Sequence, residues 1–354
     1  MTCLQDTCAR IGPIDRSAGE RAQRLLDAKT KPRRSLGRLE DLACTLAAIR
    51  GSTEIPLPTK AIVVMAADHG VAKEGVSAYP QEVTHQMLAN FAGGGAAINV
   101  LARQVGARIV VVDTGVTEPL PHTDGIRVHR LGPGTCNFTH GPAMTREQAI
   151  AGLELGSAIA DELAGDGVTV LGIGDMGIGN TTASSALTCA LIGVAPEEVT
   201  GRGTGIDDEG WCRKVEAIRR GLVVNRPQRG NPLDVLAKLG GFEIAGLAGV
   251  VLGGAARCVP LVVDGFTATI AALVAVRLAP RARDYLIASH RSVEVGHGRV
   301  LDALRLQPLL DLDLRLGEGT GAALAMPLID ASVRLLREMA TFAEAGVTDS
   351  EASG

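Results

Sequence analysis

Aromatic residues are scarce in this chain of 354 residues, which has one Trp, two Tyr and five Phe. Proteins that bind single-stranded nucleic acid stack bases on aromatic side chains, and they usually carry clustered Lys and Arg. Here the net charge is −4 and no basic block occurs. We therefore expect no nucleic-acid partner. The core must be built from Ala, Val, Leu and Ile, and the 44 Gly indicate many tight turns.

Paired cysteines and metal motifs are also missing. The seven Cys form no CxxC pair, and neither HExxH nor Walker A sequences occur. Scattered reduced thiols are typical of a cytoplasmic protein, and we expect no metal. The N-terminus carries no signal-peptide pattern. The apolar stretch 261–278 has the length of a membrane span, but Asp264, Gly265 and two Thr interrupt it. A strand, a turn and a buried helix are the better interpretation, so no membrane partner is expected.

Short apolar runs alternate with helical patterns from residue 60 onward. We expect strands at 61–67, 108–112, 168–173, 260–263 and 285–288, with helices near 82–91, 95–105, 145–164, 180–192, 208–221, 243–257, 266–277 and 294–304. Continuous apolar strands favour a sheet that is covered on both faces, and the alternation favours right-handed parallel units. The predicted fold class is α/β, a Rossmann-like parallel sheet with helices on both faces.

Both ends of the chain have helical patterns. Helices are expected at 16–28 and 35–48, before a linker at 51–58, and a final helix is expected at 322–345. We predict a small helical domain from residues 1–58 and 325–354, and a large α/β catalytic domain from residues 59–324.

Polar residues follow the expected strands, at the edge where parallel sheets bind ligands. Asp68 and His69 follow the first strand; they either order their loop by hydrogen bonds or contact a ligand directly. The other strand ends carry Asp113-Thr114, Gly174-Asp175, Asp264 and Ser289-His290.

The segment LGIGDMGIGNTT, residues 171–182, has the densest glycine pattern. Gly172, Gly174 and Gly177 match GxGxxG, which favours an NAD-dependent oxidoreductase as one hypothesis. The acidic residues about twenty positions on, however, follow a Pro at a helix start. A more general interpretation is an anion cradle of backbone N–H groups with Asn180 and Thr181 at a helix N-terminus. A turn that packs tightly and binds nothing is the alternative.

A second glycine segment, LRLGEGTG at 314–321, places Glu318 between two glycines. A bare loop lets a carboxylate approach a ligand closely, as a general base beside a nucleotide site would. The alternative is a helix N-terminus at which Glu318 favours the positive end of the dipole. A non-catalytic nucleotide-binding module is a further hypothesis, against which this setting of Glu318 speaks.

Eight segments in series resemble the nicotinate-nucleotide–dimethylbenzimidazole phosphoribosyltransferase family. They are KPRRSLGRLE, ADHGVAKEGVSAYPQEVT, FAGGGAAINVLA, GIGDMGIGNTTASSAL, GRGTGIDDEG, VVDGFTATIAALVA, SHRSVEVGH and LRLGEGTGAAL, in order over most of residues 31–324. The resemblance implies phosphoribosyl transfer from nicotinate mononucleotide to 5,6-dimethylbenzimidazole, giving α-ribazole 5′-phosphate and nicotinate, in assembly of the cobalamin nucleotide loop. It also implies a homodimer, no cofactor, and a small helical domain formed from both chain ends.

The resemblance also implies roles for individual residues. Glu318 matches the general base, and an apolar surrounding would raise its pKa. Asp264 matches a carboxylate at a strand end of the site. Residues 175–181 with Lys214, Ser292 and Arg315 match the region that holds ribose and phosphate, and Ser77, Tyr79 and Gln86 match the side that faces the benzimidazole. The expected substrate-binding set is Ser77, Tyr79, Gln86, Asp175, Met176, Gly177, Ile178, Gly179, Asn180, Thr181, Lys214, Asp264, Ser292, Arg315, Leu316 and Gly317.

Asp175 is a departure from the family, because Glu is expected more often at its position. The shorter side chain withdraws the carboxylate by one methylene, roughly 1.5 Å from bond geometry. The carboxylate then reaches the ribose either through a water or after an inward shift of the loop. We expect the shift, because the flanking Gly174 and Gly177 let the backbone move.

Overall fold

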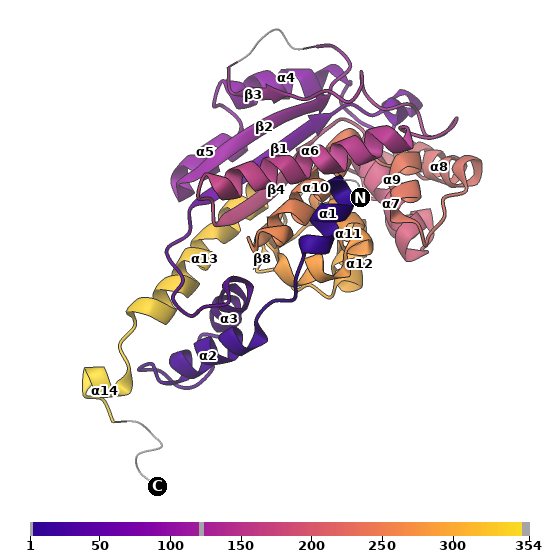
Figure 1. Ribbon diagram of the computed structural model, residues 1–354. Helices are drawn as coiled ribbons and strands as arrows, with labels where there is room; N and C mark the ends of the chain where they lie inside the picture. Colours follow the sequence, from indigo (N-terminus) through magenta and orange to yellow (C-terminus); the bar gives the residue numbers. More distant parts are fainter. Residues whose placement is uncertain (1–2, 120–123, 349–354) are drawn as a thin grey trace.

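The computed structural model describes residues 3–119 and 124–348. Its main sheet has the strand order β3-β2-β1-β4-β5-β6, with all strands parallel. The strands are β1 (Lys60–Ala67), β2 (Ala107–Gly115), β3 (Ile126–Val128), β4 (Val170–Met176), β5 (Leu261–Val263) and β6 (Leu286–Ala288) (Figure 1). The strand order reverses its direction between β1 and β4. In open α/β sheets this reversal marks the place where ligands bind, beyond the carboxyl ends of the strands.

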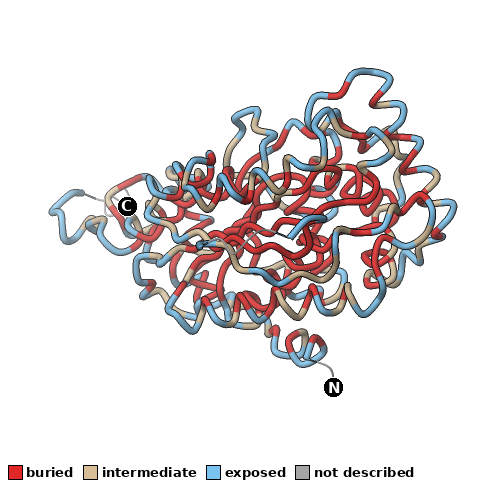
Figure 2. Tube along the Cα trace, turned by 90° about the horizontal axis from the view of Figure 1, so that it is seen from above, coloured by how far each residue is buried: buried red, intermediate tan, exposed pale blue. Residues whose placement is uncertain are grey.

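Helices cover both faces of this sheet. Alternate residues of β1, such as Val63 and Met65, face the core beneath α6 (Arg146–Gly165) and α10 (Phe242–Ala256). The intervening residues, such as Ile62, face the core beneath α4 (Glu82–Ala92), α5 (Ala97–Val105) and α13 (Thr320–Glu338). The sheet therefore lies in the buried centre of the molecule (Figure 2). The predicted α/β class, with both faces covered, is confirmed.

Glycines bring α6 and α10 into backbone contact. A Cβ on Gly156 would lie 1.8 Å from the carbonyl oxygen of Gly246, and one on Gly249 would lie 2.1 Å from that of Leu153. Residues with side chains would force the two helices apart. Close helix packing is thus one way in which a chain with few aromatic residues fills its core.

Further helices surround the carboxyl end of the sheet: α7 (Asn180–Ile192), α8 (Asp208–Asn225), α9 (Pro232–Leu239), α11 (Phe266–Leu278) and α12 (Val295–Leu304). Stretch 261–278 is β5, a turn and α11, as predicted. The sequence pattern missed β3, α9 and a small second sheet of β7 (His290–Arg291) and β8 (Leu310–Asp311). None of the helices in the two described ranges combines the length and the apolar character needed to cross a membrane.

Segments from both halves of the chain pack together at one end of the molecule. There α2 (Arg16–Asp27) and α3 (Arg38–Arg50) pack against α13, which runs away from the sheet (Figure 1). The N-terminal helix α1 (Cys3–Arg10) lies elsewhere, against α6 and α10. The division into two domains stays a prediction.

The expected single helix at 322–345 is wrong near its end. α13 stops at Glu338, Met339 is extended, and α14 (Phe342–Ala345) starts anew. The hydroxyl of Thr341 caps α14, and Thr341 also forms an antiparallel bridge with Lys29. Both interactions require the chain to leave the helical path.

Candidate active site

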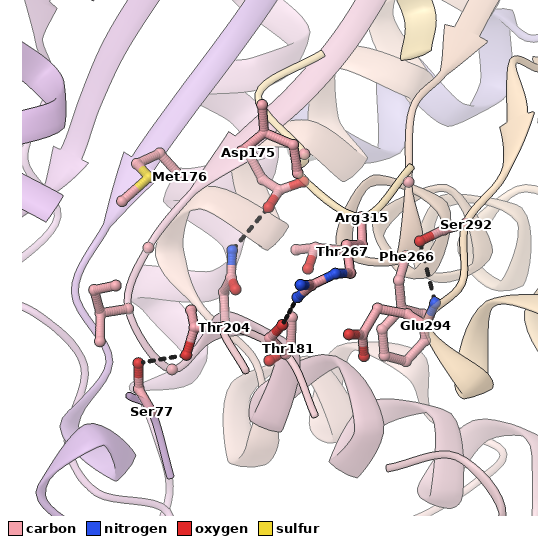
Figure 3. A pocket seen from close by; sticks show the side chains of 18 of the residues that line it. Ser77, Asp175, Met176, Thr181, Thr204, Phe266, Thr267, Ser292, Glu294 and Arg315 are labelled. Carbon is pink, nitrogen blue, oxygen red and sulfur yellow. Dashed lines mark hydrogen bonds between the residues drawn. The ribbon is translucent and has the colours of Figure 1, made fainter. Parts of the chain in front are cut away.

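A cavity of about 490 Å³ lies beyond the carboxyl ends of β4, β5 and β6 (Figure 3). Its wall comes from the loop after β1, the turn between β4 and α7, the start of α11, the segment around β7 and the loop before α13. Most of the predicted substrate-binding residues line it: Ser77, Tyr79, Asp175, Met176, Gly177, Ile178, Gly179, Asn180, Thr181, Ser292, Arg315, Leu316 and Gly317. The fold thus gathers segments that are up to 240 residues apart in the chain, from Ser77 to Gly317.

Four predicted residues do not line the cavity. Glu318 is buried directly after the lining residue Gly317, and Asp264 is buried beneath the same loop. Lys214 is buried behind Thr181. Gln86 is exposed on α4, and the structure does not bring it to the cavity wall.

The cavity also has lining residues outside the expected set; these ten are Val76, Gly203, Thr204, Gly265, Phe266, Thr267, His290, Glu294, Asp313 and Leu314. For Gly265, Phe266, Thr267 and His290 the signal was their place directly after the apolar runs that became β5 and β6. Since a parallel sheet collects its ligand at that edge, the residues on either side of Asp264 and Ser292 could have been included.

The turn between β4 and α7 forms one wall of the cavity. Gly179 has a φ of 97°, a left-handed conformation that favours glycine, and α7 begins at the next residue. The side-chain amide of Asn180 donates a hydrogen bond to Asp175 Oδ2 over 2.8 Å. The backbone N–H of Ile178 donates to the hydroxyl of Thr84 on α4 over 3.1 Å. These contacts fix the positive end of the α7 dipole beside the cavity, where it favours an anion.

The glycines of the GxGxxG match serve close packing rather than the binding of a dinucleotide. Gly172 and Gly174 lie inside β4 rather than in the turn after it. A Cβ on Gly174 would lie 2.1 Å from the backbone nitrogen of Gly319, and one on Gly177 would lie 2.4 Å from the carbonyl oxygen of Ala67. The glycines therefore allow neighbouring backbone segments to touch, and they do not build the turn of a dinucleotide fingerprint.

A buried cation adjoins this turn. Nζ of Lys214, on α8, donates to the hydroxyl of Thr181 over 2.8 Å. Burial lowers the pKa of Lys214 to about 8, and the negative charge of Glu294 partly opposes this shift. Arg315 donates to the carbonyl oxygen of Gly203 over 3.1 Å, which ties the loop before α8 to the loop before α13. An anion bound beside Thr181 would meet this lysine and the end of α7 together.

Acidic groups gather where β4 and β5 end and α13 is about to begin. Burial, and then the charges of Asp264 and Glu243, raise the pKa of Asp175 well above its ordinary value. Burial also raises the pKa of Asp264. Burial first, and then the charge of Asp264, raise the pKa of Glu318 to about 7. The direction is the one expected for Glu318 from the sequence.

Glu318 lies in a loop with an unusual backbone. Gly317, Glu318 and Gly319 all have positive φ, at 88°, 62° and 87°. The backbone N–H of Glu318 donates to the carbonyl oxygen of Asp175 over 3.1 Å, and its carboxylate is hydrogen-bonded by the backbone of Ile98 at the start of α5. The other carboxylate oxygen, Oε2, is buried and has no partner within the described residues. A buried carboxylate with a free oxygen and a pKa of about 7 is suited to accept a proton.

Asp68 and His69 order their loop, which is one of the two alternatives that the sequence left open. His69 Nε2 lies 2.6 Å from Glu243 Oε1, and both side chains are buried. Asp68 Oδ2 accepts a hydrogen bond from the backbone N–H of Thr117 over 2.7 Å. Neither residue lines the cavity. In the described ranges, no three or more His, Cys, Asp and Glu side chains are grouped as metal ligands.

Comparisons with known proteins bear on the family and the fold of this chain. A family model described as "Phosphoribosyltransferase" matches residues 11–347. The nicotinate-nucleotide–dimethylbenzimidazole phosphoribosyltransferase of Roseiflexus sp. is 55% identical to this chain, and the match covers 98% of this chain and 99% of the relative. The enzyme of the same name from Geobacter sulfurreducens is 54% identical, and the match covers 99% of this chain and 100% of the relative. A crystal structure of that enzyme from Thermus thermophilus is similar with a TM-score of 0.90 at 50% identity, and the match covers 95% of this chain and 100% of the other.

Proposed function

The chain belongs to the nicotinate-nucleotide–dimethylbenzimidazole phosphoribosyltransferase family, and is thus a pentosyltransferase; we propose that its cavity moves the phosphoribosyl group of nicotinate mononucleotide onto 5,6-dimethylbenzimidazole. The products are α-ribazole 5′-phosphate, the nucleotide of the cobalamin loop, and nicotinate. One observation carries the proposal. Glu318, buried directly behind the lining residue Gly317, has a pKa of about 7 and a carboxylate oxygen without a partner in the described residues, while the N-terminus of α7 and the buried Lys214 meet at the turn that lines the cavity.

The substrates are held at separate parts of the cavity in this proposal. The phosphate binds at the start of α7 beside Thr181 and Lys214, because positive charge is concentrated there. The benzimidazole lies between Tyr79 and Leu316, two exposed apolar side chains of the cavity wall. Holding both reactants in one orientation removes much of the entropic barrier to a reaction between two molecules.

The chemistry needs one proton acceptor. The pyridine nitrogen of nicotinate mononucleotide is cationic, so the electron pair of the breaking C1′–N bond neutralises it and no acid is required. One benzimidazole nitrogen attacks C1′, and the proton on its other nitrogen passes to Glu318. Asp175 lies at the cavity wall, where its carboxylate is available to the ribose. Catalytic hydrogen bonds of this kind commonly shorten when the substrates bind.

The direct test is incubation of the protein with nicotinate mononucleotide and dimethylbenzimidazole. We expect nicotinate and α-ribazole 5′-phosphate to appear in equal amounts. A parallel reaction with NAD and candidate reductants tests the oxidoreductase hypothesis, which GxGxxG raised and the packing of Gly174 and Gly177 disfavours. Tight NAD binding with hydride transfer, and no release of nicotinate, would contradict the proposal. Binding of the mononucleotide without turnover would favour the non-catalytic module.

The ionisation of Glu318 and of Lys214 should determine how the rate depends on pH. Glu318 must be ionised to accept a proton, so kcat/KM should fall about tenfold per pH unit below its pKa of about 7 and level off above it. Above the pKa of Lys214, about 8, loss of the lysine charge should raise KM for the mononucleotide. Initial rates from about pH 4 to about pH 9 measure both limbs. An acid limb at the ordinary glutamate value of 4.5 would contradict the role of Glu318.

Asp175 tests the departure from the family pattern. Backbone compensation is restricted, because Gly174 already touches the backbone of Gly319. A longer side chain has room instead, since Asp175 lines the cavity directly. Asp175→Glu should therefore keep kcat/KM within about tenfold of the parent, roughly 1.4 kcal/mol. Asp175→Ala removes the carboxylate and should be clearly slower. If the Ala variant matched the parent in steady-state assays, Asp175 would only shape the turn.

We further propose a cytoplasmic homodimer. The resemblance to the family implies the dimer, and exposed apolar side chains support it: Tyr79 and Leu316 at the cavity, and Val293 and Val295 in a neighbouring hollow that shares Glu294 and Arg315 with the cavity. A second copy that covered them would remove apolar area from water. All seven Cys are free thiols, which is consistent with a reducing compartment.

A further inference from the structure

Asp264 is a buried carboxylate that the proposed reaction does not use directly. It follows β5, is 1% exposed and does not line the cavity. Its Oδ2 accepts a hydrogen bond from the backbone N–H of Gly319 over 2.9 Å. Its Oδ1 accepts from those of Gly321, over 2.7 Å, and Ala322, over 3.3 Å. One side chain thus holds three backbone N–H groups at the start of α13.

The loop before α13 needs such a partner. The residue before the helix, Gly319, has no side chain to cap it, and Asp264 supplies the cap from another element. The loop also holds Glu318 in a left-handed conformation, which costs a residue with a Cβ on the order of 1 kcal/mol. Three hydrogen bonds to a carboxylate offset that cost, because hydrogen bonds to charged groups are stronger than neutral ones.

The space around the Asp264 carboxylate is tight at Gly321. A Cβ on Gly321 would lie 1.9 Å from His290 Nδ1 and 2.8 Å from Asp264 Oδ1, so only glycine at position 321 allows the carboxylate to reach the backbone. His290 Nδ1 lies 3.7 Å from Asp264 Oδ1 and 2.9 Å from the hydroxyl of Ser289. The position of the Glu318 loop is therefore coupled to the ends of β5 and β6.

We propose that Asp264 is a positioning residue for Glu318, because its carboxylate fixes the loop that carries the proton acceptor. Its negative charge also raises the pKa of Glu318. The inference rests on the proposed function. Other charged groups face the same cluster. The charges of Glu243 and Glu318 raise the pKa of Asp175, and the charge of His290 lowers the pKa of Asp264. In this proposal Asp264 touches no substrate. The sequence analysis had placed it among the substrate-binding residues, and the proposal replaces that expectation.

Asp264→Asn tests the inference. Asn has the size of Asp, but its amide nitrogen cannot accept a hydrogen bond, so one side of the cap is lost. We expect kcat to fall by about 10- to 100-fold, the usual effect of misplacing a reacting group, while KM for both substrates changes by less than about threefold. Removal of the negative charge should also move the acid limb of kcat/KM to lower pH, by about half a unit or more. A merely structural role would not move this limb.

Two further variants complete the test. Asp113→Asn is the matched control, because Asp113 is a buried carboxylate at the end of β2 that accepts the backbone N–H groups of Gly115 and Val116, away from the cavity. It should keep the acid limb of the parent. Asp264→Glu retains the charge and should leave the acid limb in place while kcat partly recovers, which keeps the inference testable if the Asn variant unfolds.

An active parent whose Asp264→Asn variant matches Asp113→Asn in kcat and pH profile would overturn the inference alone. A parent that makes no α-ribazole 5′-phosphate would overturn the proposed function, and the inference with it.

Discussion

Replacement of Glu318 by Gln is expected to lower kcat by roughly two to four powers of ten, which is the usual contribution of a positioned general base. The amide of Gln has nearly the shape of the carboxylate, and its oxygen can keep the hydrogen bond at the start of α5. The loop backbone is held by Asp175 and Asp264, neither of which the substitution touches. Steady-state assays should therefore find a large loss of kcat with KM for both substrates nearly unchanged.

The pH profile supplies the control for this substitution. If Glu318 is the proton acceptor, the residual rate of Glu318→Gln should lose the acid limb near pH 7, because Gln does not titrate. Thermal unfolding should show that the variant is folded as stably as the parent or more so, since the buried ionisable group has been replaced by a neutral one. A Gln variant with near-normal kcat would place the base elsewhere, and Asp175 would be the next candidate.

Local patterns were enough to predict the part of the site that a single segment builds. The turn from Gly177 to Thr181 follows an apolar strand and precedes a helix, so its role at a strand end could be deduced from neighbouring residues alone. The setting of Glu318 between two glycines was less decisive, because the segment alone also fitted a helix N-terminus, and the role as a base was implied by the resemblance to the family. The strand β3, Ile126–Val128, was missed because it contains a charged residue, Arg127, and is only partly buried, so it shows no continuous apolar run like those of β5 and β6. The helix α9 was missed because it has only eight residues.

Contacts between distant segments could not be predicted in this way. Gly174 and Gly319 are 145 positions apart, and only the folded chain reveals that their backbones touch and that glycine at 174 is therefore required. The cap that Asp264 provides to α13 has the same character, as does the burial of Lys214 behind Thr181. Gln86 illustrates the opposite case, because a residue transferred by resemblance lies exposed on α4 in the single chain.

Removal of the 5′-phosphate should have the second large effect. Nicotinate riboside lacks the group that the start of α7 and Lys214 would bind, so its kcat/KM should be lower than that of the mononucleotide by about a thousandfold. The figure corresponds to roughly 4 kcal/mol, or about two charge-assisted hydrogen bonds. Competition assays with both substrates measure the ratio directly. Equal use of riboside and mononucleotide would mean that no anion site operates at this turn.

Lys214→Met locates the effect within the site. Met matches the length of the lysine stem and is neutral, which suits a fully buried position on α8. The variant should lose most of its activity with the mononucleotide but little of its low activity with the riboside, so that the two changes are not additive. Lys238→Met is the matched control, because Lys238 lies on α9, pairs with Asp234 and is not part of the cavity. Equal losses of Lys214→Met with both substrates would show that the lysine acts on the ribose or on the fold rather than on the phosphate.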